Sequence, residues 1–170
     1  MADIRRRSHA STGSIYHHFK SKDQLAAEVY LEGIQDYQEG FLAVLEERES
    51  AREGIHAVIS YHLHWVSKNP DWTRYLFQRT HEGFMASAKE VFAGLNAEFM
   101  RRCARWLGAH VKAGTIRRMP ADMYVSILLG PLMEYTRLFV SGHTCTQPEH
   151  AIDALGKAAW RCLGVESHET

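Results

Sequence analysis

A short stretch near the N-terminus, residues 11–25, carries side chains of the types that read and hold a DNA duplex. Small and polar residues at the start of a helix can reach base edges in the major groove, and a glycine lets the backbone approach closely. Donors on the outer side of that helix can bond to the DNA. A lysine in the first turn of the next helix suits a phosphate, because exposed N–H groups there favour an anion. The candidate DNA-binding residues are Thr12, Gly13, Ser14, Tyr16, His17 and Lys22.

Two helices must position these side chains. The first is predicted over residues 12–19, and Ile15 and Phe19, four residues apart, lie on its inner side. Ser21 begins the second, with Gln24 three residues later in a capping-box pattern. A short amphipathic helix with no DNA role would explain the apolar pair. It would not explain the polar outer face in front of a capping box.

The charge distribution separates this stretch from the rest of the chain. The 170 residues hold 20 Lys and Arg and 20 Asp and Glu, so the net charge is zero. Residues 1–22 hold five basic side chains and one acidic one, a net charge of +4, which leaves −4 for the remainder. DNA-binding charge must therefore be local. The sequence predicts a basic N-terminal head on a mildly acidic body.

The remainder predicts an all-α body, because apolar residues recur at steps of three and four and no alternating strand pattern is visible. Only four prolines appear, and three of them suit helix starts or breaks. We predict a head with its connecting helix over residues 1–45 and a helical body over residues 46–170. The expected helices run over about 22–47 and 51–67, then briefly from Pro70, after Gly83 to Gly114, from Pro120 to Gly142, and from Pro148 to 163.

The helix expected from Pro120 is apolar on nearly all sides: Met123, Ile127, Leu128, Leu129, Leu132, Met133, Leu138 and Phe139. Such a helix needs cover on more than one face. The domain itself can supply one layer, and a second copy of the chain can supply the other. We therefore predict a homodimer through about 121–141 and 149–163, built as a four-helix bundle. The alternative is that these two helices only complete the core of a monomer.

The run from Ser11 to Leu25 resembles the recognition helix and the following helix start of the tetracycline-repressor (TetR) family. The resemblance implies a three-helix DNA-binding head, a helical body with an effector cavity, and dimerisation through the last two long helices. It also implies a palindromic double-stranded operator and a repressor that a small-molecule effector releases. By the same resemblance, the start of the recognition helix approaches the bases, its outer donors contact backbone or base edges, and Lys22 holds a phosphate.

Two features depart from the family pattern. His9 stands where the family usually has a glycine with positive φ, a conformation that histidine tolerates less well. Met1 falls at the start of the second head helix, so the first helix is not encoded in these residues. Either the beginning of the chain is missing or the head is incomplete. The rival function is accordingly a dimeric helical ligand-binding protein that has lost DNA binding.

Aromatic and methionine side chains are dense between residues 61 and 139, where the resemblance implies the effector cavity. Effector pockets are largely apolar with a few polar groups. The lining candidates are His62, Trp65, Phe84, Phe92 and Tyr135, although each of them also suits a plain core.

Other function classes find little support. The 11 histidines form no HExxH pair, so we expect neither a metal site nor a cofactor. The sequence contains no Ser/His/Asp ordering, metal cluster or phosphate loop that would indicate an enzyme. The three cysteines show no CxxC spacing, which predicts free thiols in a reducing, cytoplasmic compartment. The N-terminus lacks the apolar core of a signal peptide, and the most apolar run, residues 124–133, is half a membrane span.

Overall fold

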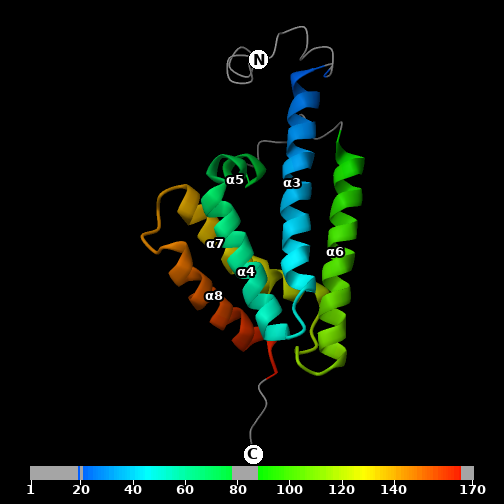
Figure 1. Ribbon diagram of the computed structural model, residues 1–170, viewed down its shortest axis with the longest axis vertical. Helices are drawn as coiled ribbons and strands as arrows, with labels where there is room; N and C mark the ends of the chain where they lie inside the picture. Colours follow the sequence, from blue (N-terminus) through cyan, green and yellow to red (C-terminus); the bar gives the residue numbers. More distant parts are fainter. Residues whose placement is uncertain (1–18, 20, 78–87, 166–170) are drawn as a thin grey trace, which may run out of the picture.

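The structure is a computed structural model that describes residues 19, 21–77 and 88–165. These residues form the α-helices of Figure 1: α3 (Lys22–Glu46), α4 (Ala51–Lys68), α5 (Pro70–Phe77), α6 (Lys89–Lys112), α7 (Ala121–Val140) and α8 (Pro148–Leu163). Strand-like pairing within the described residues is limited to one isolated antiparallel bridge between Ile116 and Gly164. The predicted all-α class is confirmed. The predicted division of the chain at residue 45 stays a prediction.

The helix ends lie where the sequence places its caps. The Ser21 hydroxyl accepts a hydrogen bond of 3.0 Å from the backbone N–H of Gln24, as the capping-box pattern predicts. Gly114 and Gly142 adopt φ values of +74° and +70° directly after α6 and α7. Side chains other than glycine rarely adopt this left-handed conformation, so each glycine ends its helix. Pro148 occupies the first turn of α8, where its missing N–H is not needed.

Helix α4 is the centre of the body. It packs against α3 on one side and against α8 on the other, and also contacts α5 and α7. One side of α4 buries Ile55, Ile59 and Leu63 against the core formed with α7 and α8. Another side buries Val58, Trp65 and Val66 against Tyr37, Phe41 and Leu45 of α3. Burial on both sides explains why α4 stays helical although it carries several β-branched residues.

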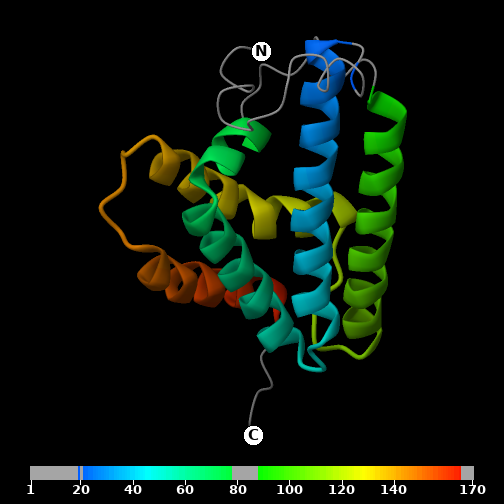
Figure 2. The ribbon, with the colours of Figure 1, turned by 45° about the horizontal axis from the view of Figure 1, so that its top comes forward.

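Helix α6 is attached to the body differently. It lies alongside α3, and the two helices run in the same direction (Figures 1 and 2). None of its residues is fully buried. The Arg102 guanidinium binds both carboxylate oxygens of Glu46 on α3, with a distance of 2.8 Å from Nε to Oε1. The indole of Trp106 lies against the backbone of α4 at Gly54. Partly buried side chains of α6, among them Phe99, Trp106 and Leu107, therefore hold the helix against the body.

The contact between Trp106 and Gly54 gives a stability prediction. A Cβ added at Gly54 would overlap the Trp106 ring, so Gly54→Ala must displace α6 or the indole. We expect it to lower the free energy of unfolding by about 1–2 kcal/mol, since overpacking outweighs the better helix propensity of alanine. Urea denaturation measures the change. Gly94→Ala is the control, because a Cβ there meets no atom within 4 Å and should raise stability by up to about 1 kcal/mol. Equal effects at both glycines would contradict the packing argument.

Candidate functional site

Of the six predicted DNA-binding residues, Lys22 lies within the described residues. It is the first residue of α3, its side chain is exposed, and Ser21 caps the helix directly before it. This geometry leaves the ammonium group free to approach an anion beside the helix N-terminus. The other five residues, Thr12, Gly13, Ser14, Tyr16 and His17, lie outside the described part of the chain. The DNA-contact assignments therefore stay predictions.

His62, a predicted effector contact, is completely buried and links three helices. The Thr136 hydroxyl of α7 donates to the Leu132 carbonyl at 2.9 Å, so it can accept from His62 Nε2 at 2.8 Å. His62 Nδ1 then accepts from the Tyr37 hydroxyl of α3 at 2.7 Å. Both ring nitrogens are thus satisfied in the neutral imidazole. Burial lowers the pKa of His62 to about 4, which keeps the ring neutral at physiological pH.

The remaining lining candidates lie apart from one another. Trp65 is buried in the core between α3 and α4, with its ring 5.2 Å from that of Tyr37. Phe92 lies half-buried near the start of α6. Tyr135 donates its hydroxyl to a backbone carbonyl of the loop between α7 and α8. Phe84 lies outside the described residues. The structure does not bring the four described candidates, His62 included, together around one cavity.

A cavity of about 350 Å³ lies instead between α6, α7, the C-terminal end of α3, the N-terminal half of α4 and the end of α8. Its walls are apolar side chains from each of these helices. They include Phe41, Leu45, Ile55, Val58, Phe99, Met100, Trp106, Leu107, Val111, Met119, Val125, Leu128, Leu129 and Leu163. A volume of this size is within the range of small-molecule sites. Among the hollows of the described residues, this one has the composition expected of an effector site.

Few polar groups reach this cavity, and most already have partners. The Tyr124 hydroxyl donates to the Arg117 carbonyl at 2.8 Å and accepts from the Met119 N–H at 3.1 Å. Burial raises the pKa of the Cys103 thiol to about 11, so the thiol stays protonated. Arg118, in the loop between α6 and α7, is exposed at the rim. It is the one charged side chain among the described residues that line the cavity.

Sequence reasoning missed this cavity, and the reason is geometric. The wall residues come from five helices and one loop, so neighbours on the wall are far apart in the sequence. The signal that could have found it is the composition of α6: Phe99, Cys103, Trp106 and Leu107 are spaced as a core stripe. None of these side chains is fully buried in the structure. A helical stripe that remains only partly covered indicates space beneath it.

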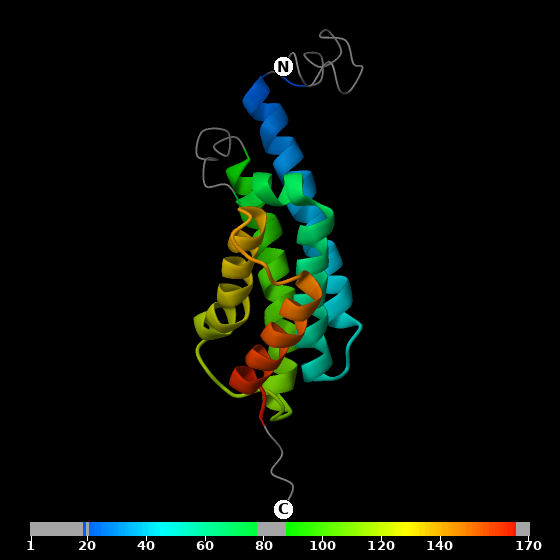
Figure 3. The ribbon, with the colours of Figure 1, turned by 90° about the vertical axis from the view of Figure 1, so that its left-hand side faces the viewer.

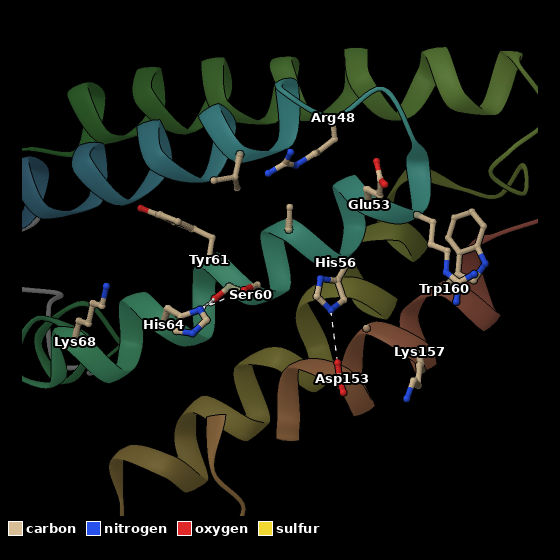
Figure 4. Close-up of a pocket in the computed structure, with 14 residues that line it drawn as sticks. Arg48, Glu53, His56, Ser60, Tyr61, His64, Lys68, Asp153, Lys157 and Trp160 are labelled. Carbon is tan, nitrogen blue, oxygen red and sulfur yellow. Dashed lines mark hydrogen bonds and ion pairs between the residues drawn. The ribbon is translucent and has the colours of Figure 1, made fainter. Parts of the chain in front are cut away.

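A second hollow, of about 970 Å³, is open and lined by both charged and apolar side chains (Figure 4). It runs along α4 between the end of α3 and α8, and the cations Arg48, Arg52, Lys68 and Lys157 contribute to its lining. His56 of α4 faces Asp153 of α8 across it, 3.8 Å apart, and both side chains are more than half exposed. Water screens charges in so open a groove, and polar and apolar side chains alternate along its lining. The smaller cavity between α6 and α7 is more apolar and less open, so it is the better candidate for a small-molecule site.

An apolar surface lies over α7 and α8, which pack side by side (Figure 3). Of the 20 residues of α7, only Leu132 and Thr136 are fully buried, although the helix is strongly apolar. A shallow hollow of about 200 Å³ between the two helices is lined largely by apolar side chains, with Ile127 and Pro131 on α7 and Leu155, Ala158 and Cys162 on α8. Exposed apolar side chains that cluster in this way can pack against another chain.

Two other kinds of site have no candidate within the described residues. No group of three or more His, Cys, Asp or Glu side chains there could hold a metal ion. No helix in that part of the chain has the length and apolar character to cross a membrane.

Comparison with known proteins bears on residues 1–29 and on the fold. Residues 1–29 match the sequence model of the bacterial regulatory proteins of the tetR family. This match confirms the resemblance seen in residues 11–25. The matched family consists of regulatory proteins, which agrees with the prediction that the chain is not an enzyme. No significant match was found among curated proteins.

Solved structures of TetR-family regulators share the fold. A regulator from Marinobacter aquaeolei VT8 is 18% identical with a TM-score of 0.74, and the match covers 96% of this chain and 83% of that one. A regulatory protein from Rhodococcus RHA1 is 19% identical with a TM-score of 0.74, covering 98% and 86%. The regulator PfmR from Thermus thermophilus is 19% identical with a TM-score of 0.71, covering 97% and 88%.

Proposed function

We propose that this chain is a ligand-responsive, DNA-binding transcriptional regulator of the TetR type that acts as a homodimer and represses. The observation that carries the proposal is the position of the family match. Residues 1–29 overlap the start of α3 (Lys22–Glu46), and the far part of the same helix forms one wall of the apolar cavity. One continuous helix thus joins the candidate DNA contact to the candidate effector site.

The mechanism follows from this connection. Phe41 and Leu45 of α3 line the cavity, so a ligand that fills it contacts α3 directly. The helix has 25 residues and is about 37 Å long, so a small rotation at its cavity end moves Lys22 much further. In a dimer, two heads must lie about one DNA turn, or a multiple of it, apart to read a palindromic operator. An effector that favours another head spacing would release the DNA.

The apolar surface of α7 and α8 supports the homodimer. Two copies of this pair of helices would form a four-helix bundle about a twofold axis. Small residues recur along its α8 side, with Ala154, Ala158 and Cys162 exposed at intervals of four. Small side chains let the helices of the two copies approach closely. The second copy then covers the apolar side chains on the outer face of α7.

A binding experiment with the whole chain tests the proposal. The probe is a duplex covering the region upstream of the protein's own coding sequence, titrated in a gel shift at low salt. We expect a complex containing two protein chains. If the chain dimerises and binds apolar ligands but gives no shift with this duplex or with random-sequence duplexes, the rival function, a dimeric ligand-binding protein without DNA binding, replaces the proposal.

Lys22→Ala should weaken DNA binding about tenfold at moderate salt, because each subunit loses one phosphate contact. The slope of log affinity against log salt concentration should become shallower by about 1.8, since about 0.9 is lost for each contact. Fluorescence anisotropy with the same duplex at several salt concentrations measures both quantities.

Lys112→Ala is the matched control. Lys112 is also an exposed helical lysine, but it lies at the end of α6, at the opposite end of the body from Lys22 (Figure 1). Its substitution removes the same charge and should change neither affinity nor salt slope. Identical behaviour of the two variants would show that Lys22 contributes only to the overall field and would refute the phosphate contact.

A further inference from the structure

The charge pattern of the apolar cavity indicates the chemical class of the effector. We propose that this ligand is a medium-chain monocarboxylate, a proposal that rests on the proposed function. The apolar chain of the ligand fills the cavity, and its carboxylate binds the Arg118 guanidinium at the rim. Three features carry the inference: the nature of the walls, the state of Arg118, and the volume.

The cavity walls offer a ligand few hydrogen-bonding partners. Phe41 and Phe99 face the space with aromatic rings, and Leu128 adds an aliphatic surface. The Tyr124 hydroxyl already donates and accepts within the loop before α7. The Trp106 Nε1–H points to the Arg48 carbonyl, 3.4 Å away. A ligand with polar groups along its length would leave them unpaired inside the cavity, which disfavours sugars, nucleosides and peptides.

Arg118 has no acidic partner within the described part of the chain. No acidic side chain among the described residues forms an ion pair or hydrogen bond with it. Its neighbour Arg117 is held differently, since Arg117 Nε donates to the Gly164 carbonyl at 2.8 Å. A guanidinium presents paired N–H donors that match both oxygens of one carboxylate. The position of Arg118 beside an apolar cavity therefore suits a ligand that has one anionic end and is otherwise apolar.

The volume indicates a hydrocarbon chain of medium length. At about 30 Å³ for each water-sized unit, the cavity of about 350 Å³ holds roughly twelve heavy atoms. Decanoate has this size. Each methylene added to a shorter chain buries more apolar surface, and should tighten binding about fourfold until the cavity is full.

Titration calorimetry on the full chain tests the class. The probes are hexanoate, octanoate, decanoate and the uncharged decanol. We expect affinity to rise about fourfold for each methylene from hexanoate to decanoate, and decanol to bind at least tenfold more weakly than decanoate. Arg118→Gln should reduce decanoate affinity about tenfold and leave decanol unchanged. Arg105→Gln, at an exposed arginine of α6 that does not line the cavity, should change neither.

A second variant tests where the hydrocarbon chain of the ligand lies. Ala104 is a small residue on the cavity wall, and Ala104→Phe places a ring in the space that the chain would occupy. It should abolish binding of decanoate and decanol alike while Arg118 is intact. If Arg118→Gln weakens decanoate but Ala104→Phe does not, the carboxylate binds at the surface and the inference is overturned.

The outcomes separate this inference from the proposed function. Equal binding of decanol and decanoate, unaffected by Arg118→Gln, overturns the carboxylate class while regulation through the cavity stands. If no probe binds, the class is wrong even when the chain binds its operator. Failure to bind DNA refutes the proposed function whichever ligand is bound.

Discussion

Lowering the pH from 7 to 4 should reduce the free energy of unfolding by about 3 kcal/mol through His62 alone. The pKa of His62 is about 4 in the folded chain and about 6.5 in an unfolded chain. Between these values the unfolded state binds the additional proton, so stability falls as the pH falls. Above pH 6.5 the ring is neutral in both states and the effect is absent. The loss therefore develops between pH 6.5 and 4.

The physical cause is the buried polar chain from Tyr37 through His62 to Thr136. A proton on Nδ1 would turn the acceptor of the Tyr37 hydroxyl into a donor, and water cannot reach a side chain with no exposed surface. The charged ring is thus both desolvated and deprived of a hydrogen bond.

Urea denaturation at several pH values measures the contribution of His62. His62→Gln should lower the free energy of unfolding by about 2 kcal/mol at pH 7, because it disturbs the buried hydrogen bonds to Tyr37 and Thr136. It should also remove the loss of stability at lower pH that the imidazole ring causes. His64→Gln is the matched control: His64 is two residues away on α4 and exposed. Its profile should follow that of the wild-type chain. A His62→Gln profile with the wild-type pH slope would show that another group causes the acid loss.

Much of the helical framework was predictable because its signals are local. Ser21 and the proline and glycine residues at the helix ends act within one turn of their own position, so sequence spacing determines their effect. The predicted end of the first long helix, residue 47, differs from the observed Glu46 by one residue. The partner that caps a helix is never far along the chain, and no tertiary knowledge is needed.

The interior could not be predicted in the same way. His62 lies on the inner side of α4, and the sequence permits it to face a ligand or a partner. Its partners Tyr37 and Thr136 are 25 and 74 residues away, and only the fold brings them together. The cavity depends on how far α6 stands from α7, a distance that periodicity does not encode. Arg118 gains its importance from that space and not from a motif.

The substitution Ala158→Glu should convert the proposed dimer into monomers. Ala158 lies on the exposed apolar surface of α8, beside Leu155 and Cys162 and opposite Pro131 of α7. In a twofold interface the new carboxylate occurs twice, and each copy would be buried without a partner. At a cost of at least about 2 kcal/mol for each, the dimer dissociation constant should rise about a thousandfold or more. Light scattering over a concentration series measures the mass directly.

Ala97→Glu is the matched control for this prediction. It makes the same change in side chain and charge at an exposed helical alanine, but on α6, away from the surface of α7 and α8. It should leave the dimer intact. If Ala158→Glu loses DNA binding together with dimerisation while Ala97→Glu keeps both, the two heads must act as a pair, as a palindromic operator requires. A wild-type chain with the mass of a monomer, or an Ala158→Glu chain that remains dimeric, would place the interface elsewhere or remove it.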